Sequence, residues 1–361
     1  MHSHQGLQEQ ELLAAPLIIR DGRDRPDQQE VIIMLADFSF TPPEQIYDGL
    51  RERSGMTPAT SSAEAISGSP PAKIISGKPG MAGMAKAGAS AAPDLNDVKY
   101  DAFLANDRTL SDPEVIQVEP GGSILLRVIN SSSMSAYHLD LGAFSGKLIA
   151  VDGFRVHPIA GHRFPISVAQ RLDIRIAIPH VPAAYPVLAI LEGERRQTGV
   201  ILLAGRAPVT RIPEIAPLPS PALTLDLERR LRAVEPLEPR KADRIHQIDL
   251  TGVMEGYVWS INGVAWNKDV PPLPISKGER VELVIRNKTL MPHPMHLHGH
   301  EFQVVEINGK RFHGAVRDSV LVTPGARVVL AFDANNPGWW AFHCHLLYHQ
   351  DAGMFTTLHY V

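Results

Sequence analysis

The sequence predicts an all-β protein made of repeated β-sandwiches. Through most of the chain, short runs rich in Val, Ile and Leu alternate with Gly, Pro and Asn, a pattern typical of strands and turns. The 361 residues include 30 prolines and 28 glycines but only 6% aromatic residues, which favours short strands over long helices. One strand pattern also recurs later in the chain, which indicates that the same sandwich occurs more than once.

The first series of expected strands lies in the first half of the chain. An N-terminal segment ends in the apolar run AAPLII, and a charged linker at residues 21–30 leads to a strand at VIIMLADFSF. Residues about 52–97 are rich in Ser, Ala, Gly, Pro and Lys without periodicity, so we expect a flexible insert there. Further strands are expected at ILLRVIN, KLIAVDG, LDIRIAI, PVLAILEG and GVILLAG.

A second series of strands follows a proline- and charge-rich linker at residues 206–245. Its start, SKGERVELVIRN, aligns with the earlier PGGSILLRVIN, so that Gly121 meets Gly278 and Asn130 meets Asn287. We therefore expect two copies of one sandwich. The N-terminal His2-Ser3-His4 resembles the end of a third copy, because the last copy ends in a similar His-Cys-His run.

The two copies differ in their histidines. The alignment puts small or apolar residues of the middle copy at the histidine positions of the last copy: Ala136, Leu139 and Leu141 at His293, His296 and His298, and about Ala189-Ile190-Leu191 at His343-Cys344-His345. The same scaffold therefore packs without these histidines. We infer that they serve chemistry rather than packing.

Composition excludes several classes of protein. The net charge of −4 gives no basic excess for binding nucleic acid. The single cysteine, Cys344, excludes an intramolecular disulfide framework, an iron–sulfur cluster held by cysteines alone and a cysteine-based zinc finger. No run of 18 apolar residues is present, so no transmembrane helix and no membrane partner are expected. The polar start, MHSHQGLQEQE, is not a signal peptide.

Eight of the 16 histidines lie between His293 and His349, in and around the segments HPMHLHGH and HCHLLYHQDAGM. Side chains alternate between the two faces of a strand. His343 and His345 therefore share one face, and Cys344 points to the other. One strand can thus place two imidazoles in one metal site and a thiolate in another.

The thiolate side has its own set of partners. His293 is out of phase with His296 and can face Cys344, while His349 and Met354 follow the cysteine after a turn. Two imidazoles, a thiolate and a weak thioether form the ligand set of a blue-copper electron-transfer site. Zinc is better served by four firm ligands.

These motifs resemble those of the multicopper oxidases, the laccase-like proteins with three cupredoxin domains. HPMHLHGH and HCHLLYHQDAGM are similar to the two C-terminal copper motifs of the family, and HCHLLYH is most similar to bacterial copper-resistance oxidases. HSHQGLQEQ resembles the second N-terminal motif. The resemblance covers nearly the whole chain, with ten ligand positions matching in order and spacing.

The resemblance implies tandem cupredoxin-like Greek-key β-sandwiches and a role for each matching residue. Type 1 copper would be held by His293, Cys344, His349 and Met354. His296 would be a type 2 ligand. The type 3 ligands would be His2, His4, His298, His343 and His345. The His343-Cys344-His345 strand would be the catalytic electron path to a trinuclear cluster, so an intact protein would hold up to four coppers of types 1, 2 and 3.

One family motif has no counterpart here. The family cluster has eight histidines, two of them from a His-x-His motif in the first domain, whereas six are present in this chain. Two metal positions would each lack one ligand. We therefore expect a truncated chain, completed by a missing first domain or an oligomer partner, and a periplasmic or extracellular location for the intact protein. The expected organisation is a remnant of the first domain at 1–26, a second cupredoxin domain without copper ligands at 27–205, the linker at 206–245 and the third domain at 246–361.

Two functions from different classes follow. The first is a laccase-like oxidase that couples one-electron oxidation of phenols, Cu(I) or similar small donors to reduction of O2 to water. The second is a copper-binding or electron-transfer protein that does not reduce O2, which the missing His-x-His motif favours. A copper nitrite reductase is a third interpretation, and the full His-Cys-His and His-Ser-His motifs argue against it.

Overall fold

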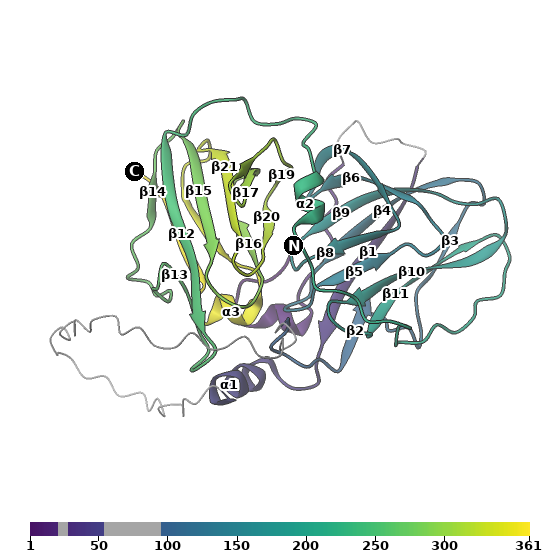
Figure 1. The fold of residues 1–361 in the computed structure, drawn as a ribbon. Helices are drawn as coiled ribbons and strands as arrows, with labels where there is room; N and C mark the ends of the chain where they lie inside the picture. The colour runs from purple at the N-terminus through teal and green to yellow at the C-terminus, as the bar shows by residue number, and fades with distance from the viewer. Residues whose placement is uncertain (21–27, 54–94) are drawn as a thin grey trace, which may run out of the picture.

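The computed structural model describes residues 1–20, 28–53 and 95–361. The expected linker at 21–30 and the flexible insert at about 52–97 lie mostly outside these residues. Of the insert, helix α1 (Pro43–Arg53) reaches into its start, and Asp97 near its end is buried. Figure 1 shows two groups of sheets side by side, with the N-terminus between them.

The first sandwich consists of two sheets. The larger has the strand order β2 (Ala102–Ala105), β1 (Gln29–Phe38), β4 (Ser123–Asn130), β9 (Arg171–Ala177), β6 (Gly146–Val151) and β7 (Phe154–Gly161). The smaller has the order β3 (Val115–Val118), β11 (Gln197–Ala204), β10 (Ala183–Leu191), β5 (Tyr137–Asp140) and β8 (Arg163–Ile166). Their facing residues, such as Leu126, Ile174 and Val187, are fully buried, which explains why these runs are rich in β-branched and aliphatic residues.

The second sandwich repeats this arrangement. Its larger sheet has the order β13 (Val258–Ile261), β12 (Arg244–Val253), β15 (Arg280–Asn287), β21 (Arg327–Asp333), β17 (Phe302–Ile307) and β18 (Lys310–Arg311), with β19 (Val316–Arg317) paired to β17. The smaller has the order β14 (Leu273–Ile275), β23 (Phe355–Tyr360), β22 (Trp339–Cys344), β16 (His293–Leu297) and β20 (Ser319–Val322). The predicted all-β class is confirmed, and the predicted domain boundaries stay a prediction.

A buried asparagine ends the equivalent strands β4 and β15 and ties each sandwich together. The Asn130 side-chain amide donates to the carbonyl oxygens of Ser135 and Ile166, and the Asn287 amide donates to those of Met291 and Val322. The two glycines of the aligned motif, Gly121 and Gly278, both have positive φ (77° and 89°), the backbone region that favours glycine. The repeat read from the sequence is therefore built from the same local contacts.

The alignment of the metal motifs was nevertheless wrong by one residue. The sheet register pairs Tyr137 with Ile166 and His293 with Val322, so Tyr137, and not Ala136, takes the place of His293. Seven positions separate Asn130 from Tyr137, whereas six separate Asn287 from His293, because the turn of the middle copy is longer.

The same register corrects the remaining positions. Asp140, rather than Leu139, takes the place of His296, and by continuation Gly142, rather than Leu141, that of His298. Leu188-Ala189-Ile190, rather than Ala189-Ile190-Leu191, takes that of His343-Cys344-His345.

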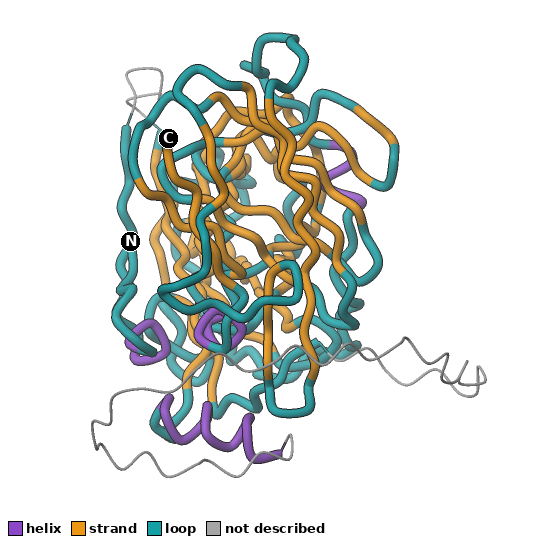
Figure 2. The backbone as a smooth tube through the Cα atoms, turned by 90° about the vertical axis from the view of Figure 1, so that its left-hand side faces the viewer, coloured by secondary structure: helices purple, strands orange, loops and turns teal. Residues whose placement is uncertain are grey.

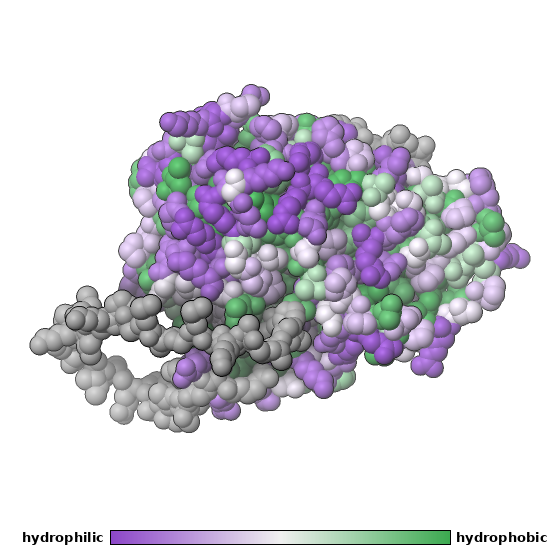
Figure 3. Space-filling model, in the orientation of Figure 1, coloured by the Kyte–Doolittle hydropathy of each residue, from purple (hydrophilic) through white to green (hydrophobic). Residues whose placement is uncertain are grey.

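Within residues 1–20, 28–53 and 95–361, the helical segments are few and short. They are the 3-10 turn η1 (Gln8–Glu11) and helices α1, α2 (Asp226–Arg230) and α3 (Leu347–Asp351). Figure 2 shows them at the edges of a body made of strands. None of the described helices has the length and apolar character needed to cross a bilayer. On the face in Figure 3, polar residues predominate over the second sandwich and apolar residues are scattered among them.

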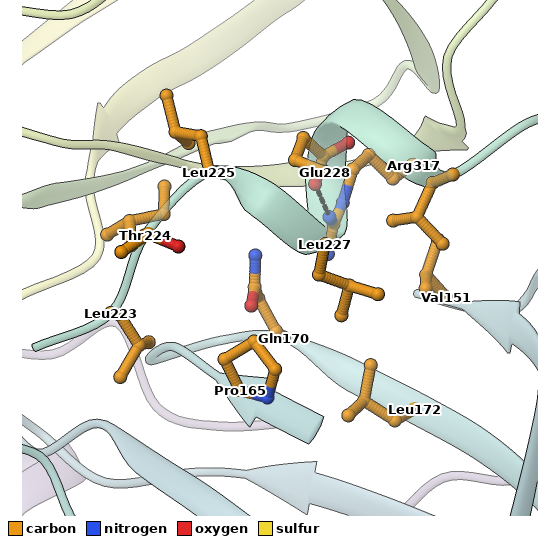
Figure 4. Close-up of a pocket in the computed structure, with 12 residues that line it drawn as sticks. Val151, Pro165, Gln170, Leu172, Leu223, Thr224, Leu225, Leu227, Glu228 and Arg317 are labelled. Carbon is orange, nitrogen blue, oxygen red and sulfur yellow. Dashed lines mark hydrogen bonds and ion pairs between the residues drawn. The ribbon is translucent and has the colours of Figure 1, made fainter. Parts of the chain in front are cut away.

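A buried ion network joins the two sandwiches. Arg317 of the second sandwich pairs with Asp152 of the first at 2.9 Å and with Glu228 of α2. Figure 4 shows the Glu228–Arg317 pair beside a small cavity that Val151, Gln170 and Leu227 also line. Burial would raise the pKa of Asp152, but the guanidinium groups of Arg317 and Arg171 hold it below its ordinary value.

The network continues to the strand edge beside the histidines. The Arg171 guanidinium donates to both carboxylate oxygens of Asp318, each at 2.6 Å. The main-chain oxygen of Asp318 lies 2.7 Å from His296 Nδ1. The contact between sandwiches therefore also fixes one of the candidate ligands.

Candidate metal centre

The adjacent strands β16 and β22, together with the residue that directly follows each, hold six of the ten candidate ligands. They pair antiparallel, with Met295 opposite Cys344 and His296 opposite His343. Strand alternation sends His343 and Cys344 to opposite faces, as the sequence predicts. The structure accordingly gathers the candidate residues into two neighbouring regions, one around Cys344 and one around His343 and His345.

The region around Cys344 is completely buried. Cys344 Sγ lies 3.6 Å from His293 Nδ1, which lies 3.2 Å from His349 Nδ1. All three side chains have no exposed surface, and their ligand atoms lie within 4.8 Å of one another. The predicted two imidazoles and thiolate are thus together in space.

Met354 is brought to the same region by its backbone. The Cys344 N–H donates to the Met354 carbonyl oxygen at 3.0 Å, and the Met354 N–H donates to the His349 carbonyl oxygen at 2.9 Å. Helix α3 and Gly353 (φ 113°) make the turn that allows this return. Met354 is also fully buried, so its thioether is part of the interior around the cysteine.

Both imidazoles near Cys344 are oriented by their far nitrogens. His293 Nε2 lies 2.7 Å from Thr289 Oγ1, whose hydroxyl donates to Asn287 Oδ1 and therefore accepts from His293. His349 Nε2 lies 2.8 Å from the Asp97 carboxylate, an acceptor when ionised. The Nδ1 lone pairs of both rings are therefore left to face the cysteine.

Asp97 is a site residue that sequence reasoning missed, since it falls in the segment expected to be a flexible insert. Its carboxylate is buried and also accepts from the Tyr257 hydroxyl at 2.7 Å. Trp259 stacks on the His349 ring with centroids 4.0 Å apart. No local pattern around Asp97 indicates this role, because its partner lies 252 positions further along the chain.

Burial controls protonation in the cysteine region. Burial lowers the pKa of His293 well below its ordinary value and raises the pKa of the Cys344 thiol. Without a cation the thiol is therefore protonated, and a cation bound there would stabilise the thiolate. A soft sulfur, two imidazoles and a buried surrounding fit copper as the occupant.

The second region contains the remaining candidate histidine ligands. His298 Nε2 and His343 Nε2 are 3.0 Å apart, and the His4 ring lies 4.8 Å from the His298 ring between centroids. These three residues form a second group that can hold a metal. Burial, together with neighbouring imidazoles, lowers the pKa of His298 to about 3 and that of His4 to about 4. Neutral imidazoles are the form that binds metals.

A third group consists of His2, Glu9 and His345. His2 Nδ1 lies 3.2 Å from one Glu9 carboxylate oxygen, and His345 Nδ1 lies 3.9 Å from the other. Glu9 is a second residue that sequence reasoning missed. His296, the predicted type 2 ligand, completes the region, with its ring 4.7 Å from that of His298 between centroids.

The N-terminal residues reach this region as a small hairpin. The Ser3 N–H donates to the Leu13 carbonyl oxygen and the Ala15 N–H donates to that of Met1, which pairs the backbone of this segment with itself. The apolar run that follows is not a strand, and Leu17 and Ile19 are 64% and 83% exposed. The run AAPLII therefore belongs to none of the sheets of the described structure.

Comparison with known proteins points to one family. Two multicopper oxidase family profiles match the chain, one at residues 29–203 and the other at 239–360. The chain is 29% identical over 373 aligned positions to the multicopper oxidase MmcO of Mycobacterium tuberculosis, covering 100% of this chain and 68% of that protein. It is 24% identical to a copper resistance protein A homolog of Pseudomonas syringae, covering 98% of this chain and 75% of the relative.

The fold agrees with a solved structure. The chain superposes on the L499M mutant of the laccase from B. aclada with a TM-score of 0.76 and 19% identity, covering 99% of this chain and 68% of the laccase. At this level of identity the superposition shows that the fold is shared. The family assignment therefore comes from the profiles, and the shared fold agrees with it.

Proposed function

We propose that the chain is a laccase-like oxidase. The premise is that the chain belongs to the multicopper oxidase family, whose members are copper-dependent oxidoreductases that use O2. The chain couples one-electron oxidation of small donors to the reduction of O2 to water. The family binds coppers of types 1, 2 and 3, which supply the one-electron redox chemistry when bound. The protein's part is to hold these ions at fixed positions and to connect them.

The observation that carries the proposal is the position of Cys344 between two histidines that face another metal group. His293, Cys344, His349 and Met354 hold the type 1 copper. His296 serves the type 2 copper, and the type 3 ligands are His2, His4, His298, His343 and His345. Because Cys344 is bonded through the backbone to its two neighbours, an electron that enters at the thiolate has a covalent path to both imidazoles.

The donor side favours small, one-electron reductants. The imidazoles near Cys344 are fully buried, so a donor would not bind to a metal at this site directly. The donor would stay at the protein surface, and the electron would pass from it through the protein to the site. Phenols and Cu(I) are donors of this kind. A relative named for copper resistance supports Cu(I), and we propose that the intact protein works in the periplasm or outside the cell.

Oxygen uptake by the copper-loaded chain tests this proposal. With a phenol as donor, the wild-type chain should consume O2 and show the intense visible absorption of a copper thiolate, and Cys344→Ser should lose both. His313→Gln, which changes an exposed histidine outside both regions, should retain both. Absence of uptake by a chain carrying its full copper complement would refute the oxidase.

The second candidate is a copper protein that transfers electrons without reducing O2. It is favoured by one observation: among the described residues, His296 stands alone as the predicted type 2 ligand, and the third group contains a carboxylate in place of a third imidazole. Visible absorption without oxygen uptake, together with one or two coppers per chain, would support it.

A further inference from the structure

The carboxylate of Glu9 lies between two candidate type 3 ligands. We propose that Glu9 is a positioning residue that accepts the Nδ1 protons of His2 and His345, and so leaves the Nε2 atom of each imidazole free to bind copper. This inference rests on the proposed function for the identity of the metal. It concerns a residue of the segment HSHQGLQEQ to which the resemblance assigns no role.

The Glu9 carboxylate lies between the His2 and His345 rings, nearer to His2 than to His345. Its two oxygens face different rings, one at 3.2 Å from His2 Nδ1 and the other at 3.9 Å from His345 Nδ1. Glu9 is 5% exposed, and both Nδ1 atoms are buried without a well-aligned hydrogen bond to any described residue. Buried imidazole nitrogens require a partner, and this carboxylate is the group that faces them.

In two other histidines of the region, a main-chain carbonyl oxygen lies at the Nδ1 atom of the ring. His296 Nδ1 lies 2.7 Å from the Asp318 carbonyl oxygen, and His343 Nδ1 lies 2.9 Å from that of Cys344. A carbonyl oxygen only accepts, so in both rings Nδ1 carries the proton and Nε2 keeps the lone pair. A histidine that binds a metal through one nitrogen is usually held in this way through the other.

The Glu9 carboxylate extends this rule to two rings at once, because one of its oxygens faces each ring. His2 and His345 come from distant parts of the chain. One side chain therefore sets the proton position of both rings and fixes the N-terminal segment against strand β22.

Hydrogen bonds within and around its turn hold Glu9 in position. It lies in the turn η1, where its carbonyl oxygen accepts from the Leu12 N–H at 3.1 Å. The next residue, Gln10, is buried and accepts from the Tyr100 hydroxyl at 2.8 Å. Glu11 of the same turn is exposed, which makes it a matched control for a change of charge.

Nitrogen NMR of the metal-free protein tests the proton positions directly. With ring-¹⁵N histidine, and His2 and His345 assigned by removing each in turn, both rings should be protonated at Nδ1 in the wild-type chain. Glu9→Gln should move one ring to the Nε2-protonated form, because its amide nitrogen donates where the carboxylate accepted. Glu11→Gln should leave both rings unchanged.

The Cu(I)-loaded protein, which is diamagnetic, gives the second measurement. Both Nδ1 protons should persist on loading, and Glu9→Gln should weaken copper binding at this group by about 10- to 100-fold. Loss of the Nδ1 protons on loading would overturn the proposal, since Glu9 would then share the metal with Nδ1 atoms. Unchanged rings in Glu9→Gln would overturn it as well.

Two further results separate this inference from the proposed function. Absence of oxygen uptake with the predicted proton positions would refute the oxidase and leave the role of Glu9 supported. If Glu9→Gln does not fold, Glu9→Asp provides the same test, because the shorter carboxylate keeps its charge and should reach only one of the two rings.

Discussion

The strand pairs β5–β10 and β16–β22 have the same register and different chemistry. Ala189 and Cys344 occupy equivalent positions, opposite Leu139 and Met295 respectively. The connections that follow differ more than the strands. β10 runs into β11 through a short turn, whereas α3 lies between β22 and β23 and brings His349 and Met354 back toward the cysteine. The fold supplies the register, and the longer connection supplies the additional ligands.

This comparison also explains why the middle sandwich is stable without a metal. Its fully buried Tyr137 occupies the position of His293, and its hydroxyl pairs with Ser132 at 3.0 Å. Apolar packing and a satisfied hydroxyl thus replace an imidazole that needs a cation. The last sandwich keeps the same backbone while burying neutral histidines.

The largest expected effect comes from one of two serine substitutions at the equivalent positions 344 and 189. Cys344→Ser should abolish the visible absorption of the copper-loaded chain, because a hydroxyl does not replace the thiolate as a ligand to copper. Ala189→Ser, at the matching place in the middle sandwich, should leave the spectrum unchanged. Absorption spectra of the two variants check this, and a spectrum retained in Cys344→Ser would contradict the assignment.

The ion network between the sandwiches should give the next largest effect. Arg317→Ala removes one partner of a buried network and leaves Asp152 and Glu228 without their shared cation, so stability should fall by about 3–5 kcal/mol. Arg163→Ala, which removes a more exposed pair with Asp140, should cost about 0–1 kcal/mol. Urea unfolding of the metal-free variants measures both, and equal costs would show that the network is not buried in solution.

The repeated asparagine tests whether the sandwiches differ only in chemistry. Asn130→Ala and Asn287→Ala should each destabilise the chain by about 1–3 kcal/mol, because each removes two hydrogen bonds to buried carbonyl oxygens. Only Asn287→Ala should also shift the copper absorption, since Asn287 holds the Thr289 hydroxyl that orients His293. A shift in both variants would contradict this separation.

The last effect should appear in the pH dependence of the metal-free protein, where the two sandwiches should respond in opposite directions. In the last sandwich the folded-state pKa of His298 is about 3, below the ordinary value of 6.5, so its neutral form is favoured and stability falls as the pH decreases below 6.5. His298→Gln should remove part of this loss.

In the middle sandwich, burial raises the pKa of Glu192 to about 7. The folded protein therefore binds this proton more tightly than the unfolded chain, and the resulting stability is lost as the pH rises through about 7. Glu192→Gln should remove the fall in stability that this group causes between about pH 4.5 and pH 7, and it should leave the slope of the profile above pH 7 unchanged. Thermal unfolding from pH 4 to pH 9 measures both limbs, and a profile that Glu192→Gln leaves unaltered would contradict this pKa.

Much of the fold and most of the candidate ligands could be predicted from local patterns. The alternation in HCHLLYH is enough to separate Cys344 from His343, and turn residues are enough to place strands such as β4 and β15. Asp97 and Glu9 could not be predicted in this way, because their roles depend on contacts with His349 and His345, far along the chain. An alignment without gaps also could not detect that the turn after Asn130 is one residue longer than the turn after Asn287.

The central claim is that the histidines gathered around His343 and His345 bind copper in addition to the site at Cys344. Its most direct test is the number of coppers per chain, measured by native mass spectrometry after loading with Cu(I) and reoxidation. Four coppers are expected in the wild-type chain and three in Cys344→Ser. A wild-type chain with a single copper that is lost in Cys344→Ser would contradict it.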